Sequence, residues 1–240
     1  LLSTVALIYE RIVCRSLDSV IAATPHIGKK FAAVNANTTV INNFPIAGEL
    51  LTERAANEEL TSICYVGGID ENRGIKTLVQ SLEHVESSVQ LDLVGKFSNA
   101  MLRNQLQTTT GWRKVNELGF LDRLEVREVL GRSLAGVVTF LPAPNHIYAQ
   151  PNKMFEYMSA GVAVIASNFS LWKKIIEGNN CGICVDPTDP KALAKAIDYL
   201  SQHPQVAREM GERGKLAVHE TYNWASEERK LLTLYEDMSQ

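Results

Sequence analysis

The stretch PNKMFEYMSAGVAVIAS, residues 151–167, decides the fold of this 240-residue chain. Its first ten residues predict a helix from 151 to 160, which Gly161 ends as a C-terminal cap. An apolar run over 162–167 follows at once and predicts a buried strand. A helix joined to a buried strand in this way is typical of a parallel α/β sheet.

The same alternation extends from this stretch toward both ends of the chain. Strands are expected at 19–23, 38–42, 62–66, 91–94, 114–118, 135–140, 162–167 and 182–185. Helices are expected at 2–17, 25–34, 74–84, 99–107, 122–133, 151–160, 171–178, 190–201, 204–221 and 225–238. The pattern predicts a doubly wound α/β sheet, with ligands bound beyond the carboxyl ends of its strands.

The bulk composition is that of an ordinary globular protein. Of its residues, 45% are hydrophobic and 21% charged, enough to bury one core and part of a second. The net charge of -3 gives no general attraction for nucleic acid. No run of about eighteen apolar residues predicts a membrane span. The chain starts at Leu1 without a signal-peptide pattern, so we expect it to begin inside a longer protein.

Two of the four cysteines, Cys181 and Cys184, have the C-x-x-C spacing of a redox or metal motif. The sequence contains no second pair and no nearby histidine to complete a zinc site. Cys184 falls in a predicted strand, where a small apolar residue suits the core. We therefore interpret these cysteines as structural thiols, which fit a reducing cytosol, and expect no metal.

The loop GGIDENRG, residues 67–74, follows the strand at 62–66. Gly67 and Gly68 allow the backbone to approach a ligand closely, and the next helix points its first amides toward the loop. Arg73 adds a cation at the same end. The combination favours a phosphate site, although the loop matches neither the dinucleotide motif nor the P-loop, and a plain tight turn has the same pattern.

Lys153 and Glu156 are three residues apart, so on a helix they share one face. There a cation can bind a diphosphate, and a carboxylate can accept two hydrogen bonds from a ribose diol. A plain surface ion pair is the alternative. The four apolar residues at 154, 155, 157 and 158 disfavour it, because a helix this apolar is buried and its glutamate needs a partner.

With these features the segment resembles the donor-site signature of GT-B-fold glycosyltransferases, especially family 4, the "glycosyl transferases group 1" domain. Other pieces resemble the same family in the same order, at 65–68, 73–74, 93–95, 119–121, 181–187 and 222–224. The resemblance covers about residues 19–238. It implies a Rossmann-like donor domain and the remnant of a second Rossmann-like domain.

The resemblance also implies a role for each site residue in binding a nucleotide-diphosphate sugar. Glu156 would bind the ribose hydroxyls, while Arg73 and Lys153 would neutralise the diphosphate and act as the catalytic residues by stabilising the leaving group. Backbone amides at 149–152 would reach the distal phosphate and the sugar, and residues 119–121 the base. The expected donor-site residues are Gly67, Gly68, Arg73, Gly119, Phe120, Leu121, Tyr148, Ala149, Gln150, Pro151, Asn152, Lys153 and Glu156.

Two positions depart from the family pattern. Tyr148 stands where the family has the first glutamate of Glu-x7-Glu, which contacts the donor sugar, so sugar recognition must differ. Gly68 stands where the family has a phosphate-binding arginine, and Arg73 occupies the position of the family's lysine. Lys153 is the residue that could compensate for the missing cation.

The activity implied is that of a retaining hexosyltransferase (EC 2.4) acting on a glycan or lipid-linked acceptor, as in bacterial polysaccharide synthesis. The acceptor hydroxyl would attack from the leaving-group face, with no cofactor and no metal. We expect a cytoplasmic protein, with any peripheral membrane contact at the inner face made through the missing N-terminal part.

The resemblance divides the chain into four parts. Residues 1–45 would end the acceptor-binding N-terminal domain, 46–60 would be a linker, 61–222 the donor domain, and 223–240 a helix that crosses back to the N-terminal domain. Because most of the acceptor side is absent, this chain alone is expected to bind nucleotide but to be inactive in transfer.

Three alternatives stay open at this point. A GT-B-fold epimerase would use a similar site but need acid–base groups near the sugar, for which His146 is the nearby candidate. A non-catalytic nucleotide-sugar-binding subunit would account for Tyr148 and Gly68. Another Rossmann-like binding domain would share only the topology.

Overall fold

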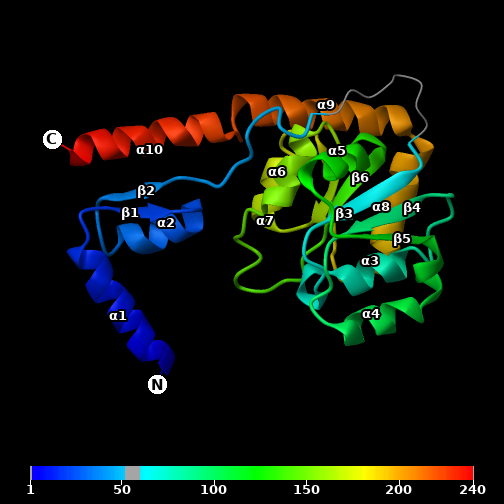
Figure 1. Ribbon diagram of the computed structural model, residues 1–240, viewed down its shortest axis with the longest axis horizontal. Coiled ribbons are helices and arrows are strands. Elements are labelled where there is room, and N and C mark those ends of the chain that lie inside the picture. Colours follow the sequence, from blue (N-terminus) through cyan, green and yellow to red (C-terminus); the bar gives the residue numbers. More distant parts are fainter. Residues whose placement is uncertain (1, 52–59, 240) are drawn as a thin grey trace. The chain divides into compact units, whose positions relative to one another are not determined.

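The computed structural model describes residues 2–51 and 60–239 and divides the chain into two compact units. Residues 1–46 and 223–240 belong to the smaller unit, and residues 47–222 to the larger (Figure 1). None of the helices in these described ranges is long and apolar enough to cross a membrane.

A six-stranded parallel sheet forms the centre of the larger unit, in the order β5-β4-β3-β6-β7-β8. Its strands are β3 (Ser62–Val66), β4 (Gln90–Val94), β5 (Val115–Gly119), β6 (Ser133–Val138), β7 (Ala163–Ser167) and β8 (Gly182–Val185). The chain builds outward from β3 in one direction and from β6 in the other. The carboxyl ends of β3 and β6 therefore form the switch point at which such sheets bind ligands. The predicted doubly wound sheet is confirmed.

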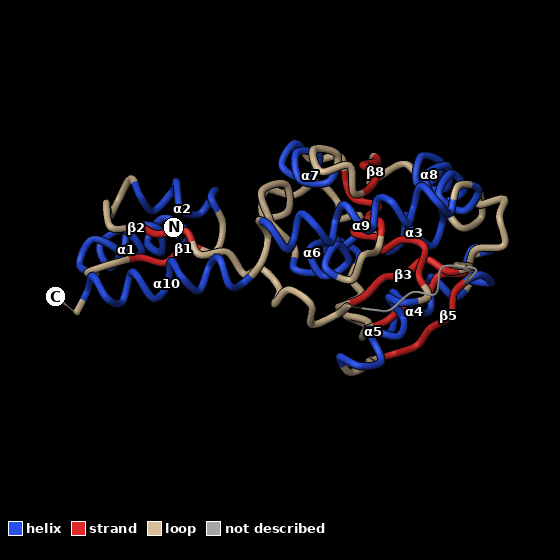
Figure 2. Tube along the Cα trace, turned by 90° about the horizontal axis from the view of Figure 1, so that it is seen from above, coloured by secondary structure: helices blue, strands red, loops and turns tan. Residues whose placement is uncertain are grey.

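Helices cover both faces of this sheet. The larger unit contains η1 (Glu71–Arg73), α3 (Ile75–Ser81), α4 (Ala100–Gln107), η2 (Thr110–Lys114), α5 (Arg123–Gly131), α6 (Asn152–Ser159), α7 (Ser170–Ile176), α8 (Pro190–Gln202) and α9 (Pro204–Glu220). On one face α3, α4 and α8 enclose the main core, and on the other α5, α6 and α9 cover the central strands (Figure 1). Figure 2 shows α9 running beside α6.

The core is built from alternate residues of the strands. Ile63 and Tyr65 of β3, and Leu91 and Leu93 of β4, are fully buried in the cluster that includes α3 and α8. β6 and β7 are buried along their whole length, because helices cover them on both sides. These two strands are the apolar runs that the sequence shows most clearly.

The smaller unit contains a parallel pair of short strands and three helices. These are α1 (Leu2–Ser16), β1 (Val20–Ala22), α2 (Pro25–Ala32), β2 (Thr38–Val40) and α10 (Trp224–Met238). Thr24 caps α2 by accepting a hydrogen bond from the Ile27 amide, as the Thr-Pro pair predicts. The buried carboxylate of Glu227 joins α10 to the N-terminal segment, because it accepts a hydrogen bond from the Asn42 amide at 2.8 Å. It also forms an ion pair with Lys230 of the same helix at 2.8 Å.

Two predicted boundaries were wrong in ways that affect the site. The helix expected over 74–84 is the seven-residue α3, which ends at residue 81, and the 3-10 turn η1 precedes it, with Gly74 between them in the left-handed region at φ 74°. The strand expected over 135–140 runs from 133 to 138. Thr139 and Phe140 are therefore loop residues at the carboxyl edge of the sheet.

Residues 46–60, which we predicted as a linker, are described only at their two ends. Residues 52–59 lie outside the described ranges. On either side of them, Leu50 and Leu60 are buried. Residues 47–51 thus pack as part of the larger unit.

Candidate functional site

The loops that follow β3, β4 and β5 lie against one another at the carboxyl edge of the sheet. The Gly67 amide donates to the Val94 carbonyl at 3.0 Å, and the Gly95 amide donates to the Gly119 carbonyl at 2.7 Å. Gly67 has φ 123°, and a Cβ atom there would lie 3.1 Å from Lys153 Nζ. Glycine is therefore required at this turn, which brings the backbone close to the lysine of α6.

Lys153 is a buried cation without a hydrogen-bond partner among the described residues. The residue is 7% exposed, and Nζ lies 3.7 Å from the centroid of the Tyr65 ring. Burial, and then repulsion by Arg73, lower the Lys153 pKa to about 7, against the opposing attraction of Glu156. Because a buried ammonium without a hydrogen-bond partner is unfavourable, an anion is the kind of group that would suit this position.

Arg73 is a second cation at this edge of the sheet, and we call the region around Arg73, Lys153 and Phe140 the crevice. Its guanidinium carbon lies 5.4 Å from the centroid of the Phe140 ring, and Lys153 Nζ lies 5.8 Å from the same centroid. The Tyr65 hydroxyl donates to the Gly68 carbonyl at 2.7 Å and holds the intervening loop. Two cations around one ring suit a ligand with two adjacent negative charges.

A pocket of about 380 Å³ opens beside Arg73. It is lined by Gly68, Ile69, Asp70, Asn72, Arg73, Lys96, Ser98 and His146. Sequence reasoning included only Gly68 and Arg73 of this group among the site residues and considered His146 as an acid–base candidate. The residues at 96 and 98 were missed because nothing in the sequence shows that the loop after β4 folds against the loop after β3. That loop contact is an isolated bridge between Ile69 and Phe97.

Glu156 has the partner that its buried helix requires. Its Oε1 atom accepts a hydrogen bond from Arg123 Nη1 at 2.8 Å. The remaining donors of Arg123, Nε and Nη2, bind the two carboxylate oxygens of Glu49 at 3.1 and 2.6 Å. The sequence predicts that a partner exists but does not identify Arg123, which lies 33 residues away on α5, or Glu49, which lies in the expected linker.

The loop before α6 places the other predicted residues around the crevice. The amide of Ala149 donates to the His146 carbonyl, and its carbonyl accepts from Trp172 Nε1 at 2.7 Å. The Ala149 amide is thus engaged within the protein. Gln150 Oε1 is buried without a partner among the described residues, and Tyr148 is 47% exposed.

Phe120 marks the opposite side of the predicted site, after β5. The residue is 73% exposed, and Lys96 Nζ lies 5.1 Å from the ring centroid. An exposed aromatic ring at the end of a strand can stack on a planar ligand group. From the sequence we predicted that main-chain atoms at 119–121 would contact the base. The exposed ring of Phe120 was not predicted.

Cys181 and Cys184 remain protonated thiols. Burial raises the pKa of each to about 12, so little thiolate is present at neutral pH. This agrees with the structural interpretation.

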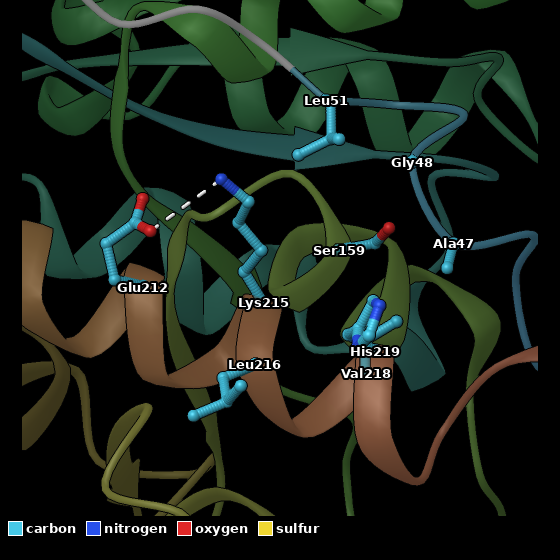
Figure 3. Close-up of a pocket in the computed structure, with 9 residues that line it drawn as sticks. All are labelled: Ala47, Gly48, Leu51, Ser159, Glu212, Lys215, Leu216, Val218 and His219. Carbon is cyan, nitrogen blue, oxygen red and sulfur yellow. Dashed lines mark ion pairs between the residues drawn. The ribbon is translucent and has the colours of Figure 1, made fainter.

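A second pocket, of about 360 Å³, lies at the C-terminal end of α6 (Figure 3). It is lined by Ala47, Gly48, Leu51, Ser159, Glu212, Lys215, Leu216, Val218 and His219. Glu212 and Lys215 form an ion pair with each other at 3.7 Å. The lining is mostly apolar and lies at the end of α6 remote from Lys153, so the crevice is the candidate site.

Comparison with known proteins gives consistent matches. Residues 49–217 match the family model described as Glycosyl transferases group 1. Alpha-maltose-1-phosphate synthase of Mycolicibacterium smegmatis is 25% identical over 205 residues, which are 79% of this chain and 51% of that protein. The chain thus spans about half the length of the curated relatives it matches.

Solved structures share the fold. Sucrose-phosphate synthase from Thermosynechococcus elongatus superposes with a TM-score of 0.79 at 23% identity, covering 97% of this chain and 61% of that one. Anabaena Alr3699/HepE in complex with UDP-glucose superposes with a TM-score of 0.76 at 16% identity, covering 94% and 65%.

Proposed function

The chain belongs to the glycosyl transferases group 1 family, and on that premise we propose that its larger unit binds a nucleotide-diphosphate sugar for a retaining glycosyl transfer. The observation that carries this proposal is the buried, unpartnered ammonium of Lys153 beside Arg73. A diphosphate supplies the negative charges that this pair lacks. No metal is needed for that neutralisation.

Lys153 takes the place of the cation missing from the β3 loop. Position 68 is glycine, where an added Cβ atom would have nothing within 4 Å, and the Lys153 ammonium reaches the adjacent Gly67 from α6. A cation delivered from α6 can contact the same phosphate as one delivered from the loop. The attraction between this cation and the phosphate would be strongest when the bond to the sugar breaks, because negative charge then develops on the diphosphate.

Glu156 would hold the nucleoside. Its Oε1 atom is occupied by Arg123, while Oε2 has no hydrogen-bond partner among the described residues and the side chain is 21% exposed. That oxygen can accept ribose hydroxyls. The base would then lie near residues 119–121, and Tyr148 and the amides of Gln150 and Asn152 near the sugar.

Transfer would proceed on the leaving-group face of the sugar. The bond from the anomeric carbon to the diphosphate oxygen breaks, the bond to the acceptor hydroxyl oxygen forms, and the hydroxyl proton passes to the departing diphosphate. Arg73 and Lys153 stabilise that leaving group. The acceptor would be a glycan or a lipid-linked acceptor of bacterial polysaccharide synthesis in the cytoplasm. Because the chain spans about half of its relatives, we propose that it binds donor without transferring sugar on its own.

A binding screen tests the proposal. Thermal-shift measurements against UDP-, GDP- and ADP-sugars should reveal one nucleotide that stabilises the chain. Glu156→Gln should weaken binding of that nucleotide about tenfold, since a neutral amide is a poorer acceptor for the ribose diol. Binding of the 2′-deoxy analogue should be weakened less. Stabilisation by none of the three classes would reject the proposal.

Two alternatives are separated by turnover of the full-length protein. An epimerase would convert the sugar nucleotide in the absence of acceptor, using His146, whose Nδ1 lies 2.9 Å from the Leu141 carbonyl oxygen and whose ring lines the pocket. A non-catalytic subunit would bind the donor and yield no product with any acceptor.

The affinity for a nucleotide sugar is expected to fall as pH rises through neutrality. The pKa of Lys153 is about 7 in the free protein, so its ammonium is charged below that pH and neutral above it. Between pH 6.5 and 8.5 we expect a loss of about twentyfold, measured by calorimetry with the nucleotide sugar, whose diphosphate does not titrate in this range. Lys153→Arg should give a flat profile, and a flat wild-type profile would contradict the assignment.

A further inference from the structure

Arg123 binds two carboxylates at once, and one of them belongs to the candidate donor site. Nη1 donates a hydrogen bond to Glu156 at 2.8 Å, and Nε and Nη2 donate to the two carboxylate oxygens of Glu49. Bidentate pairing of this kind fixes the plane of the guanidinium. The two carboxylates also raise the pKa of Arg123, because the hydrogen bonds that it donates to Glu49 and Glu156 favour its charged form.

The backbone that holds Arg123 is also fixed. Arg123 is the first residue of α5, and the capping box of Asp122 and Glu125 anchors that helix start. It follows residues 119–121, where the base is proposed to lie. The guanidinium thus connects the base side of the crevice with the ribose side.

Two cations compete for Glu156. Lys153 lies three residues earlier on α6 and is attracted to the Glu156 carboxylate. Even so, Glu156 is hydrogen-bonded to Arg123, and Lys153 Nζ has no partner among the described residues. Because the Glu156 carboxylate pairs with Arg123, it does not form an ion pair with Lys153. The Lys153 ammonium therefore stays available for the diphosphate.

We propose that Arg123 is a positioning residue that holds Glu156 toward the ribose and away from Lys153, and that Glu49 holds Arg123 in turn. This inference rests on the proposed function. Its consequence is that nucleotide affinity depends on residues 47–51, which follow directly on the smaller unit in the chain. Binding of nucleotide must then stabilise the Glu49–Arg123 contact by the same factor, because the coupling is reciprocal.

The test is a pair of double-mutant cycles on the full chain, with the nucleoside diphosphate selected by the screen as the probe. Arg123→Ala should weaken binding about tenfold in the wild-type background and have no effect in the Glu156→Gln background. Glu49→Gln should weaken binding about two- to fivefold, as expected for a partly exposed ion pair, and have no effect once Arg123 is alanine.

A spectroscopic signature distinguishes positioning from general support of the fold. The groups facing Lys153 are Arg73, Glu156, Tyr65 and Cys64. When Arg123 is removed, Glu156 is free to pair with Lys153, so the pKa of Lys153, followed by NMR of a ¹³C-labelled lysine side chain, should rise above about 7. Arg127→Ala, on the exposed side of the same helix, should change neither binding nor that pKa.

Additive losses in either cycle, or an unchanged Lys153 pKa in Arg123→Ala, would overturn this inference. The proposed function would survive that outcome, provided that wild type binds nucleotide and Glu156→Gln weakens it. If wild type binds no nucleotide, both fail together.

Discussion

Replacing Lys153 with methionine is expected to weaken binding of the nucleoside diphosphate about 100-fold and, at the same time, to stabilise the ligand-free protein. Loss of affinity follows from removal of one partner of a desolvated charge pair, which typically costs about 2–5 kcal/mol. Stabilisation is expected because, in the ligand-free protein, the buried ammonium has no hydrogen-bond partner among the described residues. Its pKa falls from 10.5 to about 7 on folding, which means that folding opposes its charge.

The sign of the stability effect can be followed with pH. Between about 7 and 10.5 the unfolded chain binds the Lys153 proton and the folded chain does not, so the free energy of unfolding should rise with pH in wild type. Lys153→Met removes this contribution. At pH 7 we expect the variant to unfold with a free energy higher by about 1–4 kcal/mol, measured by urea denaturation.

A second substitution provides the matched control. Gly68→Arg places a cation at the position where the family has one, and the site has open space for a side chain. In the Lys153→Met background it should restore much of the lost affinity. A Lys153→Met variant that binds as well as wild type would remove this residue from the donor site.

Gly74→Ala is expected to destabilise the larger unit by about 3 kcal/mol or more and to abolish nucleotide binding. Gly74 has φ 74°, and a Cβ atom there would overlap the Thr139 carbonyl oxygen. Left-handed backbone costs a non-glycine residue about 1–2 kcal/mol, and relief of the overlap needs a backbone shift that adds about 1–3 kcal/mol. That shift would move η1, and with it Arg73, away from β6.

Gly68→Ala, in the same loop, is the comparison. Position 68 does not have a positive φ, and nothing lies within 4 Å of its Cβ position. Its substitution should leave stability within about 0.5 kcal/mol of wild type, as for other surface changes. Urea denaturation of both variants tests the pair, and equal stabilities would contradict the role given to Gly74.

Local signals in the sequence were strong where a residue's structure depends on its neighbours in the chain. The Thr24-Pro25 cap, the end of α6 before Gly161 and the existence of the buried strands β6 and β7, though not the bounds of β6, were predicted correctly. Each depends on hydrogen bonds or burial within a few residues. The left-handed Gly74 was missed, because its close approach is to Thr139, which follows β6 and is distant in the sequence.

The sequence by itself determined that this chain folds as a doubly wound α/β sheet of a glycosyltransferase family, and that the glutamate of α6 must have a partner. Only the tertiary structure decided which partner it has. Arg123 and Glu49 meet Glu156 through chain segments far apart in sequence, and the Lys153 ammonium is left unpaired among the described residues as a result. Periodicity reports which face of an element is buried, whereas the pairing of charges depends on how separate elements pack.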